Sequence, residues 1–246
     1  MLAYGVLLAL GLGWFVLTGL FGSSVLHAVP RRIPLTLRLW LWLAGLYSLA
    51  FSALTSLVCL GILIGYSWKT LPQAGHGIGD LWYLFMVSVL PYVALALFGA
   101  LAASAFTNIQ PAIEAARSAS ELLRGVSSDL RQFQGIAIRV LETPVLVAAV
   151  VEVSRRPIIL VTRGVLSELE PAELEAVYWH ELGHALREHN GLGRIARFAA
   201  TLLPWLPLAR DAKDAVSDLC ESIADQFAES QVATQTLASA RAKFAF

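Results

Sequence analysis

Charged residues are scarce in this chain and absent from three long stretches of it. Asp, Glu, Lys and Arg make up 15% of the 246 residues, and 57% are hydrophobic, which is far more apolar than an ordinary soluble domain. No charged residue occurs in 1–26, 39–66 or 81–106. Each stretch reaches the roughly 20 residues that a helix needs to cross a hydrocarbon core of about 30 Å. The sequence therefore predicts three transmembrane helices.

Cysteine is rare, and the charges that do occur balance. The two cysteines, Cys59 and Cys220, form no C-x-x-C pair, which excludes a disulfide framework and a cysteine metal or redox motif. A formal net charge of zero gives no indication of a nucleic-acid partner. The first apolar run could be a secretory signal, but no basic segment precedes it and it is longer than a typical signal core. We interpret it as a retained span.

The few basic residues between the apolar runs predict the orientation of the chain. The first connection carries three arginines, whereas the second carries only Lys69, opposed by Asp80. Short loops rich in Lys and Arg stay in the cytoplasm. The segment after the third run again carries arginines, Arg117, Arg124 and Arg131. We therefore expect the amino terminus outside and everything after Phe106 to begin in the cytoplasm.

The chain beyond the apolar runs has a different composition and reads as a mixed α+β domain. We expect a transmembrane region over 1–106, a helical connector over 107–135 and a folded α+β domain over 136–246. The stretches IAIRVLE, VLVAAVVEV and PIILVT are short and rich in β-branched residues, which is typical of strands. Pro171 can occupy the first position of a helix, where its missing N–H costs nothing.

That helix contains the sequence HELGH, from His180 to His184. Residues four apart on a helix lie one above the other, about 5–6 Å apart at Cβ, so both imidazoles can bind one ion. Glu181 lies about 100° further round the helix, where it can act on a metal-activated water without binding the metal itself. The competing interpretation is a helix with two solvated histidines and an ion-pairing glutamate. The motif alone is only moderately specific.

A third ligand decides between these interpretations. The three-histidine form of the motif needs a histidine where Asn190 stands, and His189 is one residue early. The stretch LCESIADQFAES offers Glu221 and Asp225, four apart on one helical face. Glu221 would complete a site of two histidines and a carboxylate with the fourth position left for water. Asp225 would hold a ligand histidine by its other ring nitrogen, although this pair could also be a solvated face.

Between the two candidate ligand stretches lies RFAATLLPWLPLAR, which is apolar but too short to span a bilayer. If it crossed once, Glu221 and the histidines would lie on opposite sides and could not share a metal. We therefore expect a re-entrant or interfacial apolar hairpin near 192–209.

The segment PIILVTRGVLSELEPAELEAVYWHELGHALREH, followed by an apolar segment and CESIAD, resembles membrane zinc metallopeptidases of the BlaR/MecR type. It is also similar to the HtpX and CAAX-prenyl-protease group of gluzincins. The resemblance implies zinc ligands at His180, His184 and Glu221, a catalytic base at Glu181 and a supporting role for Asp225. It also implies a substrate lying along an edge strand, which we assign to PIILVT. We expect no counterpart of the extracellular sensor domain, so β-lactam sensing would not carry over.

The sequence thus predicts a mainly α membrane protein with three transmembrane helices and a cytoplasmic, gluzincin-like α+β zinc domain. It would bind one Zn²⁺, although the same ligands also suit iron, and would cleave a protein or peptide, for example a transcriptional repressor. HtpX-like quality control of membrane proteins and a non-catalytic membrane scaffold are the alternatives. Tyr178, Arg187 and His189 are candidate oxyanion stabilisers. We expect the carboxyl-terminal helix after Gln231 to serve packing, rather than oligomerisation or membrane binding.

Overall fold

The computed structural model describes residues 2–70, 95–96, 99, 103, 130–153 and 156–243. These residues form two compact units. The first unit takes in 2–30, 40–70 and 197–213, and the second takes in 31–39, 130–153, 156–196 and 214–243. The predicted third span, 81–106, lies outside the described residues except at a few isolated positions, and 107–129 of the predicted connector lies outside them entirely.

Two long apolar helices dominate the first unit. Helix α1 runs over Leu2–His27 and helix α2 over Leu35–Thr70. Their segments Tyr4–His27 and Leu35–Tyr66 are long and apolar enough to cross a membrane. Many of their large side chains are exposed, such as Phe51 at 72%, which suits helices whose outer surface meets lipid rather than water. The first two predicted spans therefore coincide with helices.

The apolar stretch near 192–209 reverses direction between two further helices. Helix α7 runs over His189–Leu202 and helix α8 over Pro207–Glu229. Leu206, at the turn, is 1% exposed and packs in one cluster with Leu49 of α2. A Cβ on Gly19 of α1 would lie 2.8 Å from Leu206 Cδ2, so the glycine leaves the room that this leucine fills. Ser23 Oγ also donates to Asp211 Oδ2 at 2.6 Å.

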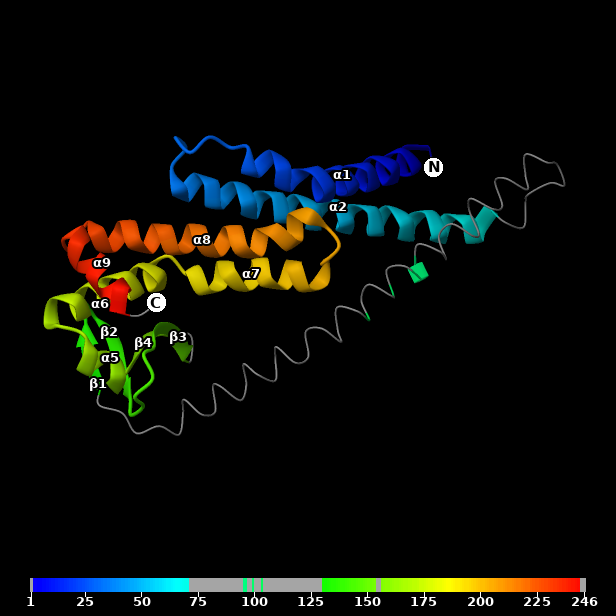
Figure 1. Cartoon of the computed structure of the whole chain (residues 1–246). Helices are drawn as coiled ribbons and strands as arrows, with labels where there is room; N and C mark the ends of the chain where they lie inside the picture. The colour runs from blue at the N-terminus through cyan, green and yellow to red at the C-terminus, as the bar shows by residue number, and fades with distance from the viewer. Residues whose placement is uncertain are drawn as a thin grey trace. The chain divides into compact units, whose positions relative to one another are not determined.

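The second unit contains a four-stranded mixed sheet (Figure 1). Its strands are β1 Leu130–Phe133, β2 Ile136–Leu141, β3 Ala148–Val153 and β4 Arg156–Thr162, in the order β1-β2-β4-β3. Strands β2 and β4 are parallel, and the other two pairs are antiparallel. The three predicted strands are confirmed.

The predicted helical connector is wrong where the structure describes it, because 130–133 form strand β1. Gln134 and Gly135, which join β1 to β2, have φ angles of 48° and 83°. Two positive φ angles are the geometry of a type I′ turn, whose twist matches that of paired strands. Pairing with β2 then outweighs the helical pattern of the local sequence.

The edge strand beside the helices is also not the expected one. The stretch PIILVT belongs to β4, which pairs with β2 on one side and β3 on the other. A strand paired on both sides has no free backbone groups for a further strand. Within the described part of the chain, the free edge on this side of the sheet belongs to β3, so the assignment of PIILVT as the substrate-binding edge was wrong.

Three helices pack with this sheet in the second unit. Helix α5 runs over Arg163–Glu168, α6 over Pro171–Leu186 and α9 over Thr234–Lys243. Helix α6 contacts β3, β4 and α9. The core between sheet and helices is aliphatic, with one tyrosine, and contains Ile138, Val140, Ile159, Val161, Val165, Val177, Tyr178 and Ala240. This packing holds α6 rigidly, and α6 carries the His-Glu-x-x-His motif.

Candidate metal centre

The two motif histidines lie on one face of α6 and point toward each other. Pro171 begins the helix, and the Glu173 carboxylate accepts a hydrogen bond from the Glu170 backbone N–H at 2.9 Å, which satisfies a free donor at the helix start. One turn separates His180 from His184, and their Nε2 atoms are 3.0 Å apart. His180 is fully buried at 0% exposed. The helix thus presents two imidazole nitrogens to a single point.

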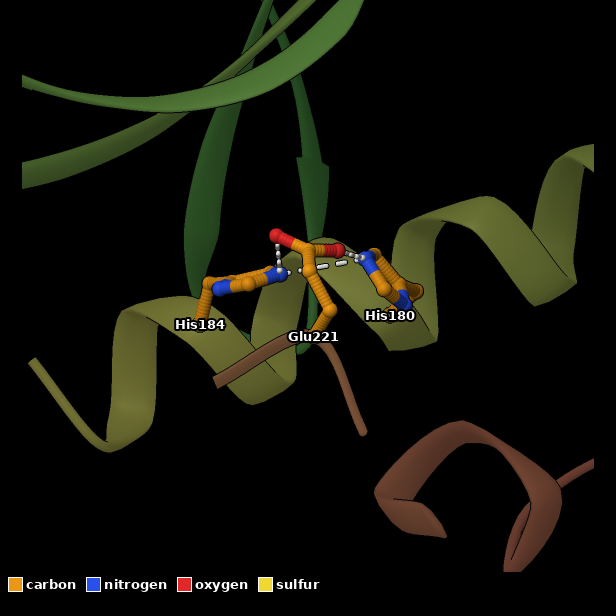
Figure 2. Close-up of side chains that lie close together, drawn as sticks. All are labelled: His180, His184 and Glu221. Carbon is orange, nitrogen blue, oxygen red and sulfur yellow. Dashed lines mark hydrogen bonds and ion pairs between the residues drawn. The ribbon is translucent and has the colours of Figure 1, made fainter. Parts of the chain in front are cut away.

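Glu221 of α8 completes this arrangement from a second helix. Its Oε2 lies 3.4 Å from His180 Nε2, and its Oε1 lies 3.5 Å from His184 Nε2. Figure 2 shows the carboxylate lying across the two rings, with one oxygen toward each. Helix α8 comes this close because Gly183 has no side chain: a Cβ there would lie 3.2 Å from Ala224 Cα.

The three side chains fit a divalent metal ion. One ligand atom from each residue lies within 4.8 Å of the other two, and two imidazoles with a carboxylate form a common zinc donor set. Glu221 Oε2 is buried and accepts no hydrogen bond from the described residues. Its 3.4 Å approach to His180 Nε2 is an ion-pair contact rather than a hydrogen bond, and a bound cation would satisfy this oxygen. Sequence reasoning had named all three residues.

The sequence range that contains this cluster matches a known family. The model of peptidase family M48 matches residues 112–239, slightly more than half of the chain. The chain belongs to peptidase family M48. M48 peptidases are zinc metalloproteases, so the chain is a metallopeptidase of the HtpX kind, a hydrolase that acts on proteins or peptides. No curated protein and no solved structure matches it.

Glu181 of this M48 peptidase lies between the histidine pair and strand β3. It is 4% exposed, and burial raises the pKa of its carboxyl group, although the neighbouring His180 and His184 oppose the rise. The backbone N–H of Val150 in β3 donates a hydrogen bond to this carboxylate. Glu181 therefore links the motif helix to the edge strand.

The outer ring nitrogen of His180, Nδ1, lies against a carboxylate. His180 Nδ1 lies 2.9 Å from Asp225 Oδ1, which leaves Nε2 facing Glu221. Asp225 Oδ1 in turn lies 2.6 Å from an Nη2 of Arg241 in α9, and the same guanidinium is 4.0 Å from Glu221 Oε2. The carboxyl-terminal helix, which we expected only to serve packing, thus contributes a cation to the centre. No spacing in the sequence indicates Arg241.

The imidazoles and carboxylates of the centre shift one another's pKa values toward the charged forms. Burial opposes a charge on His180, but the carboxylates of Asp225 and Glu221 raise its pKa to about 9. Burial alone would raise the pKa of Glu221, yet the two imidazoles hold it well below its usual range. Glu221 is therefore ionised at neutral pH, as a metal ligand must be, whereas His180 must release its proton when it binds a metal.

The three candidate oxyanion stabilisers occupy different places. Tyr178 packs in the core against Phe133, with ring centroids 5.4 Å apart. Arg187 is exposed and caps the end of α6. His189 is buried and touches His184 through its Nδ1. Beside it, Asn190 Nδ2 donates to the Val150 carbonyl at 2.8 Å. The sequence had excluded His189 as a third ligand but gave no sign of its contact with His184.

Proposed function

We propose that this M48 peptidase is a zinc endopeptidase in which His180, His184 and Glu221 bind one Zn²⁺. The observation that carries the proposal is the convergence of their three ligand atoms within 4.8 Å. The contact of Asp225 with His180 supports it, because such outer hydrogen bonds orient metal-binding imidazoles. Zinc, when bound, would activate a water molecule and polarise the scissile carbonyl.

Glu181 is the general base in this proposal. Its carboxylate lies next to the histidine pair on α6 but is not one of the three proposed metal ligands. It can therefore take a proton from the attacking water. Burial raises its pKa, which brings the carboxyl group closer to the operating pH and favours both taking that proton and passing it to the leaving amine. Val150 N–H holds the carboxylate in place.

The substrate would lie extended along the free edge of β3. Among the residues that the structure describes, this strand is paired on one side only, with β4, and its Val150 N–H contacts Glu181. A peptide that adds to this edge would make backbone hydrogen bonds on a strand next to the catalytic carboxylate. This replaces the earlier assignment to β4.

The same proposal places the enzyme in a membrane with its zinc domain in the cytoplasm. The apolar helices α1 and α2 support this orientation, together with Arg31 and Arg32 of their connection and Arg38 in the first turn of α2. Its substrates would then be cytoplasmic or membrane-proximal proteins. A repressor cleaved in BlaR/MecR-like signalling and a damaged membrane protein removed in HtpX-like quality control are the two candidate classes.

Glu181→Gln tests the catalytic assignment. In detergent-purified protein we expect about one zinc per chain in wild type and variant alike, because Glu181 binds no metal. Hydrolysis of fluorescein-labelled casein should fall roughly 10²- to 10⁴-fold, the range for loss of a general base. Glu175→Gln, on an exposed position of the same helix, is the control and should retain activity.

The alternatives give different results in the same experiment. Zinc bound by a wild type that hydrolyses no casein, or an active Glu181→Gln variant, would contradict the catalytic part of the proposal. Folded protein without zinc in any sample would contradict the metal site and favour the membrane scaffold. Loss of zinc in His184→Ala but not in Glu221→Ala would place the third ligand elsewhere.

A further inference from the structure

His189 is a buried polar residue beside the metal centre that the proposed mechanism does not use. It is 4% exposed. Its Nδ1 lies 3.1 Å from Nδ1 of His184, and the two rings meet edge to face with centroids 5.0 Å apart. The contact is on the side of the His184 ring away from Nε2, so His189 does not belong to the ligand cluster.

The backbone between α6 and α7 brings His189 to this position. Helix α6 ends at Leu186, and Glu188 then adopts a φ of 53°, a left-handed conformation that residues other than glycine rarely adopt. This turn directs His189 back onto His184. The next residue, Asn190, donates to the Val150 carbonyl at 2.8 Å, which ties the start of α7 to the edge strand. His189 is thus held from both sides.

Proton positions allow only one arrangement of this contact when His184 binds a metal. A neutral imidazole that gives its Nε2 lone pair to a metal carries its proton on Nδ1. His184 Nδ1 must then donate, and His189 Nδ1 must accept. The proton of His189 is consequently on its Nε2.

We propose that His189 is the positioning residue for His184, accepting a hydrogen bond from His184 Nδ1–H and thereby fixing both the tautomer and the ring orientation of that ligand. This rests on the proposed zinc site. Each ligand histidine then has its own support: the Asp225 carboxylate for His180 and a neutral imidazole for His184. Such outer partners typically contribute 10- to 100-fold to metal affinity.

Substitution of His189 separates positioning from packing. In the detergent-purified protein, His189→Leu fills the same space with an apolar side chain that offers no acceptor, whereas His189→Asn retains one. We expect His189→Leu to weaken zinc binding about 10- to 100-fold in a chelator competition and to shift the visible absorption bands of the Co²⁺-substituted protein. His189→Asn should recover part of both. Leu186→Ala, an exposed position in the same turn, should match the wild type.

A measurement on the unmodified protein keeps the proposal testable even if His189→Leu fails to fold. Imidazole ¹⁵N shifts of the zinc-loaded wild type should show the proton on Nδ1 in His184 and on Nε2 in His189. A proton on His189 Nδ1, or a His189→Leu variant with wild-type zinc affinity and Co²⁺ spectrum, would overturn the proposal. A wild type that binds neither metal would instead overturn the zinc site on which it rests.

Discussion

The closeness of α6 to α8 at Gly183 leads to a prediction about zinc affinity. A Cβ at this position would meet Phe227 Cδ1 at 3.1 Å, Ala224 Cα at 3.2 Å and Phe227 Cβ at 3.4 Å. Phe227 can rotate, but Ala224 Cα is backbone and moves only with its helix. Gly183→Ala therefore requires α8 to recede by a few tenths of an ångström.

That movement would carry Glu221 with it, since Glu221 lies one turn before Ala224 on α8. Metal–ligand distances tolerate about 0.2 Å, so we expect Gly183→Ala to weaken zinc binding and Gly183→Val to weaken it at least about tenfold, or roughly 1.4 kcal/mol. The free energy of unfolding of Gly183→Ala should change little, because two effects oppose each other. Alanine gains about 1 kcal/mol of helix propensity over glycine, which offsets part of the roughly 1–3 kcal/mol cost of overpacking.

Gly191 provides the matched control. It lies in the first turn of α7 in the same unit, and among the described residues a Cβ there would come within 4 Å of Arg194 Nη2 alone, at 3.9 Å. Gly191→Ala should raise the free energy of unfolding by about 0.5–1 kcal/mol and leave zinc affinity unchanged. Chelator competition measures the affinity, and thermal unfolding of the zinc-free protein measures stability. If Gly183→Val binds zinc as tightly as Gly191→Val, the close approach of the helices does not position Glu221.

Two further predictions concern the carboxyl-terminal helix. Lys243 and Ser239, with the Glu170 backbone N–H, lower the pKa of Glu173 to about 2, against about 4.3 in an unfolded chain. The ionised form is therefore favoured by folding, and its contribution is full above about pH 5 and lost as the pH falls toward 2. As the pH falls over this range, the melting temperature of the zinc-free protein should fall more steeply in the wild type than in Glu173→Gln. The exposed variant Glu229→Gln should behave like the wild type. Equal slopes for the wild type and Glu173→Gln would refute this prediction. Arg241→Gln should weaken zinc binding about tenfold, because Asp225 loses its partner, while Lys243→Gln lowers stability without changing zinc affinity in the same chelator competition.

The parts of the site that short-range geometry controls follow from the sequence. Residues four apart on a helix share a face whatever the helix packs against, so His180 pairs with His184, and Glu221 shares a face with Asp225. Composition likewise indicates the strands and the apolar runs, because burial in a sheet or exposure to lipid selects residue types directly. The match to peptidase family M48 agrees with the class of chemistry that the motif predicts.

Only the tertiary structure decided which elements meet. The pattern of PIILVT is the same in a central strand as in an edge strand, and pairing on both sides placed it as β4 while leaving β3 at the edge. The helical pattern before Ile136 gave way to β1 because a paired strand gains hydrogen bonds that an isolated turn of helix does not. Arg241 and His189 touch the centre through contacts that depend on the turn at Glu188 and on the docking of α9. Such contacts join residues from separate elements, and no periodicity along the chain records them.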